Sequence, residues 1–373
     1  MRCEVQQADR ATSPVMNRRA LLLGSMALAA GAALPAQAHP GAVEWRVFRD
    51  RYISADGRVI DTGNGGVSHS EGQGYGMLLA VAYGGQEDFD RLWNWTLAHL
   101  SRGEDKLLSW RFNPSTRGQD PSNLNNASDG DLLVAWALCR AAVKWRSAEH
   151  LRRAKAMATD FLRLNTVEVA GRLLMRPGTV GFDHGEHVVV NPSYAVFSAM
   201  RELNAMQPDP RWTRLEEGML AVIREARFSS LRLVPDWVEA PRAGGRFRLA
   251  SEWPQRFSWD AVRVPLYMVW AGLQNHPALD PLMEVWFDPA RGASPPAWWD
   301  LRGETPAPYG ATPGIVAVAR LLLASRLGQS SGRPIPFPAA GDGQDYYNAV
   351  LVLLCHLATD EVLAHGSYRE ASI

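Results

Sequence analysis

The sequence predicts an all-α fold with a few short strands, arranged as a helical bundle or a closed helical toroid. Apolar residues recur at helical spacing through most of the chain after residue 71. The helical segments follow one another in pairs, and short Pro- and Gly-rich turns separate them. No fixed-period repeat accompanies these pairs, which argues against a solenoid.

The predicted elements begin after a short irregular region that extends to about residue 66. A small strand is expected at 58–61, because this segment follows the turn sequence Asp56-Gly57. Helices are predicted at 72–83, 87–101, 129–147, 148–164, 193–205, 210–227, 258–273, 278–289, 311–326 and 343–361. Short strands are predicted near 171–175 and 187–190 and within 231–250.

Residues 1–38 are predicted to be an export signal that is removed after Ala38. Arg18 and Arg19 precede an apolar run over 20–33, and Ala36-Gln37-Ala38 supplies the small residues of a cleavage site. The paired arginines resemble a twin-arginine signal, with Sec export as the alternative. The apolar run is short for a bilayer span, which disfavours a membrane anchor. We therefore expect a periplasmic or secreted protein with no stable membrane insertion after cleavage.

The remaining residues, 39–373, are predicted to form a single catalytic domain. The Pro-rich stretches 292–314 and 329–340 are too short, and too rich in aromatic or apolar residues, to be disordered linkers. The chain has 39 Lys+Arg and 39 Asp+Glu, so it lacks the basic excess that is typical of nucleic-acid binders. It contains no His-Glu-x-x-His motif, P-loop or nucleophile elbow. The sequence therefore predicts no metal, no organic cofactor and no nucleic-acid partner.

The tryptophans are predicted to fall into a buried group and an exposed group. Four tryptophans are expected in the core: Trp93, Trp136, Trp145 and Trp270. Five others have polar neighbours in the sequence: Trp110, Trp253, Trp259, Trp298 and Trp299. Exposed tryptophans suit a sugar-binding surface, because the faces of pyranose rings are apolar patches ringed by hydroxyls.

Cys139 and Cys355 lie in apolar runs and are predicted to be separate buried thiols, with a disulfide as the alternative.

Three acidic segments stand where predicted helices begin. Glu71 lies among three glycines ahead of an apolar run, which would hold an acid at the edge of a cleft. The structural alternative is that Ser70 caps the helix and Glu71 favours its first turn. Asp129 and Asp131 flank a glycine, with Ser128 as a candidate cap.

The third acidic segment places Asp260 three residues before Arg263, so that both side chains would share one helix face. An ordinary ion pair is the structural alternative. Two carboxyl groups on opposite sides of a cleft are what glycoside hydrolysis requires: one donates a proton to the leaving oxygen, and the other activates water or attacks the anomeric carbon. A confined glutamate suits the first role, and an aspartate fixed by an arginine suits the second.

Five motifs together resemble glycoside hydrolase family 8. They are Ser-Glu-Gly-Gln-Gly-Tyr-Gly-Met at 70–77, Ala-Ser-Asp-Gly-Asp-Leu at 127–132, Asn-Pro-Ser-Tyr at 191–194, Pro-Asp-Trp at 235–237 and Trp-Asp-Ala-Val-Arg-Val at 259–264. The resemblance spans residues 59–348 and is strongest to the periplasmic endoglucanases encoded with bacterial cellulose synthases. It implies an (α/α)6 toroid and hydrolysis with inversion at the anomeric carbon.

The resemblance also implies roles for individual residues. Glu71 would be the general acid and Asp260 the base that activates water, while Asp129 would bind the sugar that distorts at the cleavage point. Tyr194 and Arg263 would lie close to the water and the base. Three further aromatic residues would contact substrate: Trp110 as a stacking platform, Tyr75, and Trp259, where relatives often have tyrosine.

The implied reaction is endo-hydrolysis of a β-1,4-glucan such as cellulose, with a link to the cellulose synthase complex. Chitosanases and mixed-linkage glucanases of the same family are the alternative activities. An alternative from another class is a non-catalytic glucan-binding partner of cellulose synthase. The presence of both Glu71 and Asp260 argues against a non-catalytic role.

Overall fold

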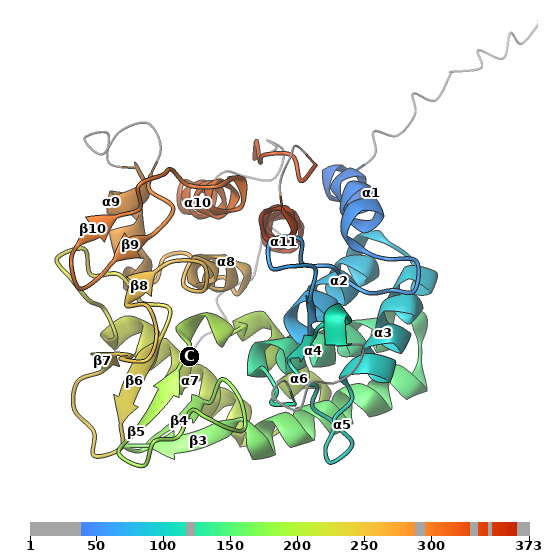
Figure 1. Cartoon of the computed structure of the whole chain (residues 1–373), viewed down its shortest axis with the longest axis horizontal. Coiled ribbons are helices and arrows are strands. Elements are labelled where there is room, and N and C mark those ends of the chain that lie inside the picture. Colours follow the sequence, from blue (N-terminus) through green and yellow to red (C-terminus); the bar gives the residue numbers. More distant parts are fainter. Residues whose placement is uncertain (1–38, 117–123, 288–294, 329–334, 342–344, 364–373) are drawn as a thin grey trace, which may run out of the picture. The chain divides into compact units, whose positions relative to one another are not determined.

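The helices form a closed ring with an inner and an outer layer (Figure 1). The computed structural model describes residues 39–116, 124–287, 295–328, 335–341 and 345–363. Its inner helices are α2 (Ser70–Tyr83), α4 (Ser128–Trp145), α6 (Phe197–Met206), α8 (Arg263–Trp270) and α11 (Tyr346–Leu363). Each inner helix contacts the next in this order, and α11 contacts α2, so the ring closes.

Most of the outer helices pack against the backs of the inner ones. The outer helices are α1 (Pro40–Tyr52), α3 (Gln86–Leu100), α5 (Ala148–Leu164), α7 (Pro210–Glu225), α9 (Asp280–Phe287) and α10 (Pro313–Arg326). Helix α3 packs on α2, α5 on α4 and α7 on α6, while α10 contacts both α8 and α11. Helices paired in sequence are therefore also paired in space across the two layers.

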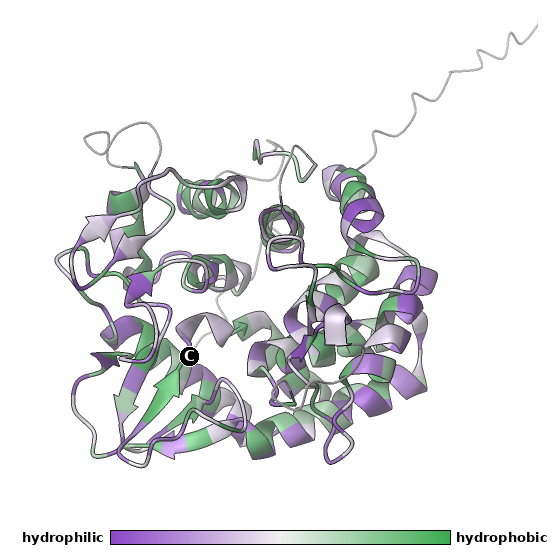
Figure 2. Ribbon diagram, viewed as in Figure 1, coloured by the Kyte–Doolittle hydropathy of each residue, from purple (hydrophilic) through white to green (hydrophobic). Residues whose placement is uncertain are grey.

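The two layers differ in where their apolar residues lie. All residues of α2 from Gly72 to Val81 are buried, because an inner helix is covered on every side. The outer helix α5 instead buries one stripe, which includes His150, Ala154, Met157 and Phe161. Figure 2 shows the contrast between mainly hydrophobic α11 and the mixed outer helices α3 and α5.

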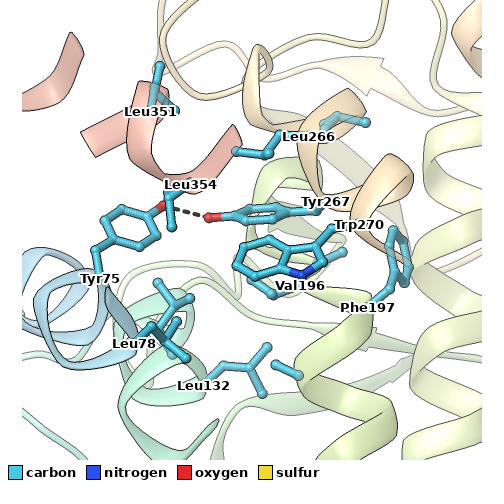
Figure 3. Close-up of a cluster of buried hydrophobic side chains, with 14 of the residues drawn as sticks. Tyr75, Leu78, Leu132, Val196, Phe197, Leu266, Tyr267, Trp270, Leu351 and Leu354 are labelled. Atoms are coloured by element: carbon cyan, nitrogen blue, oxygen red, sulfur yellow. Dashed lines mark hydrogen bonds between the residues drawn. The ribbon is translucent and has the colours of Figure 1, made fainter. Parts of the chain in front are cut away.

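Side chains from all five inner helices meet in one apolar cluster (Figure 3). The cluster includes Tyr75, Leu78, Leu132, Val196, Phe197, Leu266, Tyr267, Trp270, Leu351 and Leu354. The inner layer is therefore held by hydrophobic contacts that join segments far apart in sequence.

Short antiparallel strands complete the fold. They are β1 (Ser68–His69) with β2 (Arg111–Phe112), β3 (Thr166–Val169) with β4 (Arg172–Met175), β5 (His187–Val190) with β6 (Val238–Pro241) and β7 (Arg248–Leu249), and β8 (Arg256–Phe257) with β9 (Trp299–Asp300) and β10 (Thr305–Pro306). Strands β3 to β10 lie together on the left of the ring in Figure 1. Several of these strands lead directly into loops at the starts of inner helices. They therefore fix the backbone on which the site is built.

Two of the predicted elements are wrong in kind, and some short strands were not predicted. The segment before residue 66 is not irregular, because α1 buries Trp45, Phe48 and Tyr52 on one face. The spacing of these aromatic residues indicates a helix, although charged residues stand between them. The strand predicted at 58–61 is only a pair of isolated bridges, and the β3 strand was not predicted.

Two predicted helices start later than expected. The helix predicted at 193–205 begins at Phe197, because a 3-10 turn, η3 (Pro192–Tyr194), precedes it. The helix predicted at 258–273 is reduced to Arg263–Trp270, and Asp260 lies in the turn ahead of it. In both places an irregular turn carries the candidate site residues.

The predicted core is largely confirmed. Trp93, Trp136 and Trp270 are buried, and Trp145 packs against the core from a partly buried position. Cys139 and Cys355 are both buried and free, as predicted. The expectation that Trp299 belongs to an exposed sugar-binding surface is wrong. Strand β9 pairs with strands on both sides, and Trp299 is only 8% exposed.

The predicted export signal at 1–38 lies outside the described residues. Within the part of the chain that the structure describes, no helix is long and apolar enough to cross a membrane.

Candidate active site

The first residues of the inner helices come together at one end of the ring. Glu71 is the second residue of α2, Asp129 is the second residue of α4, and Arg263 begins α8. Asp260 lies three residues ahead of Arg263. Helix N-termini present unpaired N–H groups and the positive end of the helix dipole, so they favour carboxylates. The ring thereby gathers three acidic side chains at a place that stabilises negative charge.

Arg263 joins these three carboxyl groups. Its Nη1 donates to the Glu71 carboxylate and lies 3.5 Å from Asp129 Oδ2, while its Nη2 donates to Asp260 Oδ1 at 2.7 Å. Nη2 also donates to Ser193 Oγ at 3.0 Å. The Arg263 side chain is only 3% exposed, so its charge needs these partners. One buried cation therefore holds residues from four segments in a single network.

Tyr75 is a further buried hydrogen-bond partner of Arg263. Its side chain has no exposed surface, its hydroxyl accepts from Arg263 Nη1 at 3.3 Å, and it shares a hydrogen bond with the Tyr267 hydroxyl (Figure 3). The prediction that Tyr75 contacts substrate is therefore wrong, because α2 points this ring at its helical neighbours. Arg263 is likewise buried, and in this structure it binds the acidic side chains.

Asp129 is the most buried of the three acidic residues. Burial, followed by the charge of Glu71, raises the pKa of Asp129 well above its usual range, and Arg263 only partly opposes this. Asp129 Oδ1 accepts from the Gly130 N–H at 2.8 Å. The raised pKa favours the protonated form of Asp129.

Asp260 is more open, with 30% of its side chain exposed. Burial raises the pKa of Asp260, the Arg263 charge lowers it, and the Glu71 charge raises it again. The nearby polar side chains of Asn191 and Trp237 lower this pKa further. A carboxylate with a raised pKa is a stronger base than an ordinary aspartate, and partial exposure leaves it accessible to water.

Glu71 is held by the start of α2, although not in the predicted way. The cap is His69, whose Nδ1 accepts from the Gly72 N–H at 2.9 Å and whose Nε2 lies 3.3 Å from Asp61 Oδ2. Ser70 is the first helical residue and is buried. The prediction of a Ser70 cap is wrong, because the imidazole already satisfies the free N–H group.

The predicted cap at Ser128 is also absent. The N-cap of α4 is Ala127, without a side-chain hydrogen bond. Gly130 instead packs against the start of α2, and a Cβ atom at this position would lie 2.7 Å from Glu71 N. This close approach of α2 and α4 sets Glu71 beside Asp129.

The predicted aromatic platforms are partly exposed around the acidic cluster. Trp110 is tied by backbone hydrogen bonds to Ser70 and Asn125, at 3.0 and 2.8 Å, so it lies beside the starts of α2 and α4. Tyr194 places its ring 5.9 Å from the Arg263 guanidinium. Trp259 is 37% exposed, and its carbonyl accepts from the Tyr347 hydroxyl.

A second group of aromatic residues has no assigned role in the sequence prediction. The rings of Trp237 and Trp253 are stacked with centroids 4.9 Å apart, and Phe182 lies 5.9 Å from Trp237 with nearly parallel rings. Trp237 also meets Tyr194 edge to face at 6.0 Å. The polar surroundings of Trp253 singled it out in the sequence, whereas no local pattern identifies Phe182.

Ser193 and Asn191 were also missed as individual contributors, although their motif was recognised. Ser193 accepts from Arg263 and donates to Asn191 Oδ1, and both residues belong to the turn that follows β5. Among the described residues, no group of three His, Cys, Asp or Glu side chains is placed to hold a metal ion.

The arrangement agrees with comparisons to known proteins. The sequence model of glycosyl hydrolases family 8 matches residues 19–361. The chain is 39% identical over 322 residues to a probable endoglucanase of Novacetimonas hansenii, covering 86% of this chain and 91% of the relative. It is 38% identical over 284 residues to an endoglucanase of Cellulomonas uda, covering 76% and 78% of the two chains.

Structural similarity extends over the same length. The solved structure of the endo-β-1,4-glucanase CMCax from Acetobacter xylinum aligns with a TM-score of 0.78 and 38% identity, over 87% of this chain and 99% of that protein. The predicted (α/α)6 fold is thereby confirmed. The chain belongs to glycoside hydrolase family 8.

Proposed function

We propose that this glycoside hydrolase is an endo-β-1,4-glucanase that cleaves internal bonds of cellulose or a related β-1,4-glucan with inversion. One observation carries the proposal: Arg263 binds Glu71 and Asp260 and lies 3.5 Å from Asp129 at one end of the helical ring. The similar proteins named endoglucanase support the choice of reaction.

In the proposed mechanism, Glu71 gives a proton to the departing glycosidic oxygen. Asp260 takes a proton from a water molecule as that water attacks the anomeric carbon from the opposite face of the sugar. Glu71 thus becomes ionised while Asp260 becomes neutral, so the net charge of the pair is unchanged. Arg263 contacts both groups and stabilises whichever one is ionised.

Asp129 and the aromatic residues would bind the sugar chain. Asp129 lies beside Glu71 and, when protonated, can donate a hydrogen bond to a sugar hydroxyl at the cleavage point. Trp110, Tyr194 and Trp259 have partly exposed rings on which sugar faces can stack. Partly exposed rings around a charged centre suit an extended polysaccharide chain.

The decisive experiment measures reducing ends released from soluble carboxymethyl-cellulose. Glu71→Gln and Asp260→Asn should each lower kcat by about 10²–10⁴-fold, the contribution of a general acid or base. Glu149→Gln is the control, because Glu149 pairs with Arg152 and Arg153 on the exposed face of α5. If Glu71→Gln or Asp260→Asn keeps wild-type activity, the substituted residue is not the general acid or the general base. A wild-type protein that binds glucan without cleaving it would instead support the non-catalytic alternative.

The stereochemistry gives a second test. Inversion requires that the first product released from a β-glucan be the α-anomer, which NMR detects before mutarotation. Initial release of the β-anomer would contradict the proposed mechanism. Parallel rates on chitosan and on mixed-linkage β-glucan would distinguish the alternative activities within the family.

The cellular setting is also proposed. We infer export to the periplasm or medium with cleavage after Ala38, and a role beside the cellulose synthase complex. N-terminal sequencing of protein from the native host should begin at His39. Loss of this protein should alter the cellulose made by the host, and unchanged cellulose would separate the enzyme from synthesis.

A further inference from the structure

Asp260 is carried by an irregular turn, Ser258–Val262, between β8 and α8. Val262 N donates to the Ser258 carbonyl at 3.0 Å, and Arg263 N donates to the Asp260 carbonyl at 3.0 Å. These bonds close the turn but leave the N–H groups of Ser258 and Ala261, on either side of Asp260, to be satisfied from elsewhere.

Asp236 satisfies both of these groups. Its Oδ1 accepts from Ser258 N at 2.9 Å and from Ala261 N at 2.8 Å, and its Oδ2 accepts from the Ser258 hydroxyl. Asp236 N also donates to the Arg256 carbonyl at 2.7 Å. A single buried carboxyl group thus holds the backbone two residues before and one residue after Asp260.

Asp236 is itself anchored beside a sheet. Val238, at the start of β6, pairs with Val190, at the end of β5. Asn191 follows Val190 and Trp237 precedes Val238, and both polar side chains lower the pKa of Asp260. Asp236 stands one residue before Trp237, so the β5–β6 pair anchors the residue that holds the backbone around Asp260.

We propose that Asp236 is a positioning residue for the reaction, which fixes the Ser258–Val262 turn so that Asp260 is aimed at the attacking water. This inference rests on the role proposed above for Asp260. Asp236 is only 4% exposed, so it acts through the turn and has little surface to offer a substrate. Misplacing a catalytic group by about 1 Å can cost roughly 10²-fold in rate.

The split between kcat and KM provides a readout that a merely structural role of Asp236 would not give. Burial, followed by the charge of Asp260, raises the pKa of Asp236 to about 7. Asp236 is therefore neutral in the acidic range, where its Oδ1 can still accept from both N–H groups of the turn. Asp236→Asn keeps the shape of the side chain but replaces the carboxyl oxygen that faces the Ser258 hydroxyl.

The experiment measures kcat and KM on a soluble β-1,4-glucan. Asp236→Ala should lower kcat about 100-fold and Asp236→Asn about tenfold, with KM within about twofold, because the loss falls on alignment of the base.

Glu304→Gln is the matched control, because Glu304 accepts from the N–H and hydroxyl of Ser230 in the same pattern, at 2.6 and 2.8 Å. Circular dichroism confirms folding; if Asp236→Ala does not fold, Asp236→Asn decides. A folded Asp236→Asn with wild-type kcat overturns the inference. The proposed function does not depend on that result, provided that Asp260→Asn is inactive in the same assay. An active Asp260→Asn would contradict both the catalytic role of Asp260 and the positioning role of Asp236.

Discussion

At the residue scale, the site depends on balancing one cation against three carboxyl groups. Arg263 is buried, and an unpaired guanidinium in that position would cost several kcal/mol. Glu71, Asp129 and Asp260 supply its partners and are in turn kept close together by it. The acid and base proposed for catalysis are thus also the partners that stabilise this arginine.

The closest backbone approach in the site gives a prediction. Gly130→Ala is expected to lower kcat by about 100-fold, because the added Cβ would lie 2.7 Å from Glu71 N and push the start of α2 away from α4. The measurement is kcat on soluble cellulose, with circular dichroism to confirm folding.

Gly85→Ala is the control for this substitution. Gly85 precedes α3 with φ of −138°, and an added Cβ would meet no atom within 4 Å. Its activity should remain at the wild-type value. If Gly130→Ala also keeps wild-type kcat, the spacing between α2 and α4 is not critical for Glu71.

At the element scale, the inner helices present reactive residues at their N-termini and apolar residues along their length. Helix α11 follows this rule: Tyr346 and Tyr347 stand at its start, and buried aliphatic residues follow. His356 is an exception within α11. Its ring meets Phe337 edge to face at 4.9 Å.

His356 makes the stability of the ring pH-dependent. Burial, followed by the charge of His39, lowers the pKa of His356 to about 4. The unfolded chain binds this proton below about pH 6.5, whereas folded His356 stays neutral until about pH 4. The stabilisation is therefore complete above pH 6.5 and is lost as the pH falls toward 4.

Urea unfolding of His356→Leu tests this effect. Between pH 7 and pH 4, the wild type should lose up to about 3 kcal/mol more unfolding free energy than the variant. Equal losses in the two proteins would show that His356 does not carry the effect.

At the scale of the whole molecule, charged groups help to close the ring away from the site. Arg140 of α4 binds Glu202 of α6 and Glu361 of α11, and Trp270 of α8 donates to Glu361 at 2.7 Å. These residues line a cavity of about 360 Å³. Arg140 follows Asp129 by eleven residues, or about 16 Å along the helix. The network therefore links four inner helices at a distance from the proposed chemistry.

Arg140→Ala is accordingly expected to affect folding more than catalysis. The unfolding free energy should fall by roughly 2–3 kcal/mol, less than for a fully buried pair because the Glu202 side chain is 40% exposed. Activity at low temperature should be retained. Arg152→Ala, which breaks an exposed pair with Glu149, should change stability by less than about 1 kcal/mol. Equal effects of the two substitutions would contradict a ring-closing role.

Local signals made much of the fold predictable. The apolar spacing located ten of the eleven α-helices that the structure describes, and the acidic residues at helix starts identified the segments of the site. Helix α1 was missed because charged residues interrupt its aromatic stripe. The His69 cap was missed because the preference for serine at a helix start is only statistical.

The sequence by itself determined the fold class, the separate buried thiols and the acidic segments, because periodicity and motifs depend on residues close together in the chain. Only the tertiary structure decided that Arg263 meets Glu71 across 192 positions, that Tyr75 lies beneath the site, and that Asp236 clamps the turn of Asp260. The physical reason is that such contacts depend on how helices pack around the ring. Packing also decides which polar groups lose their water and must find a partner inside the protein.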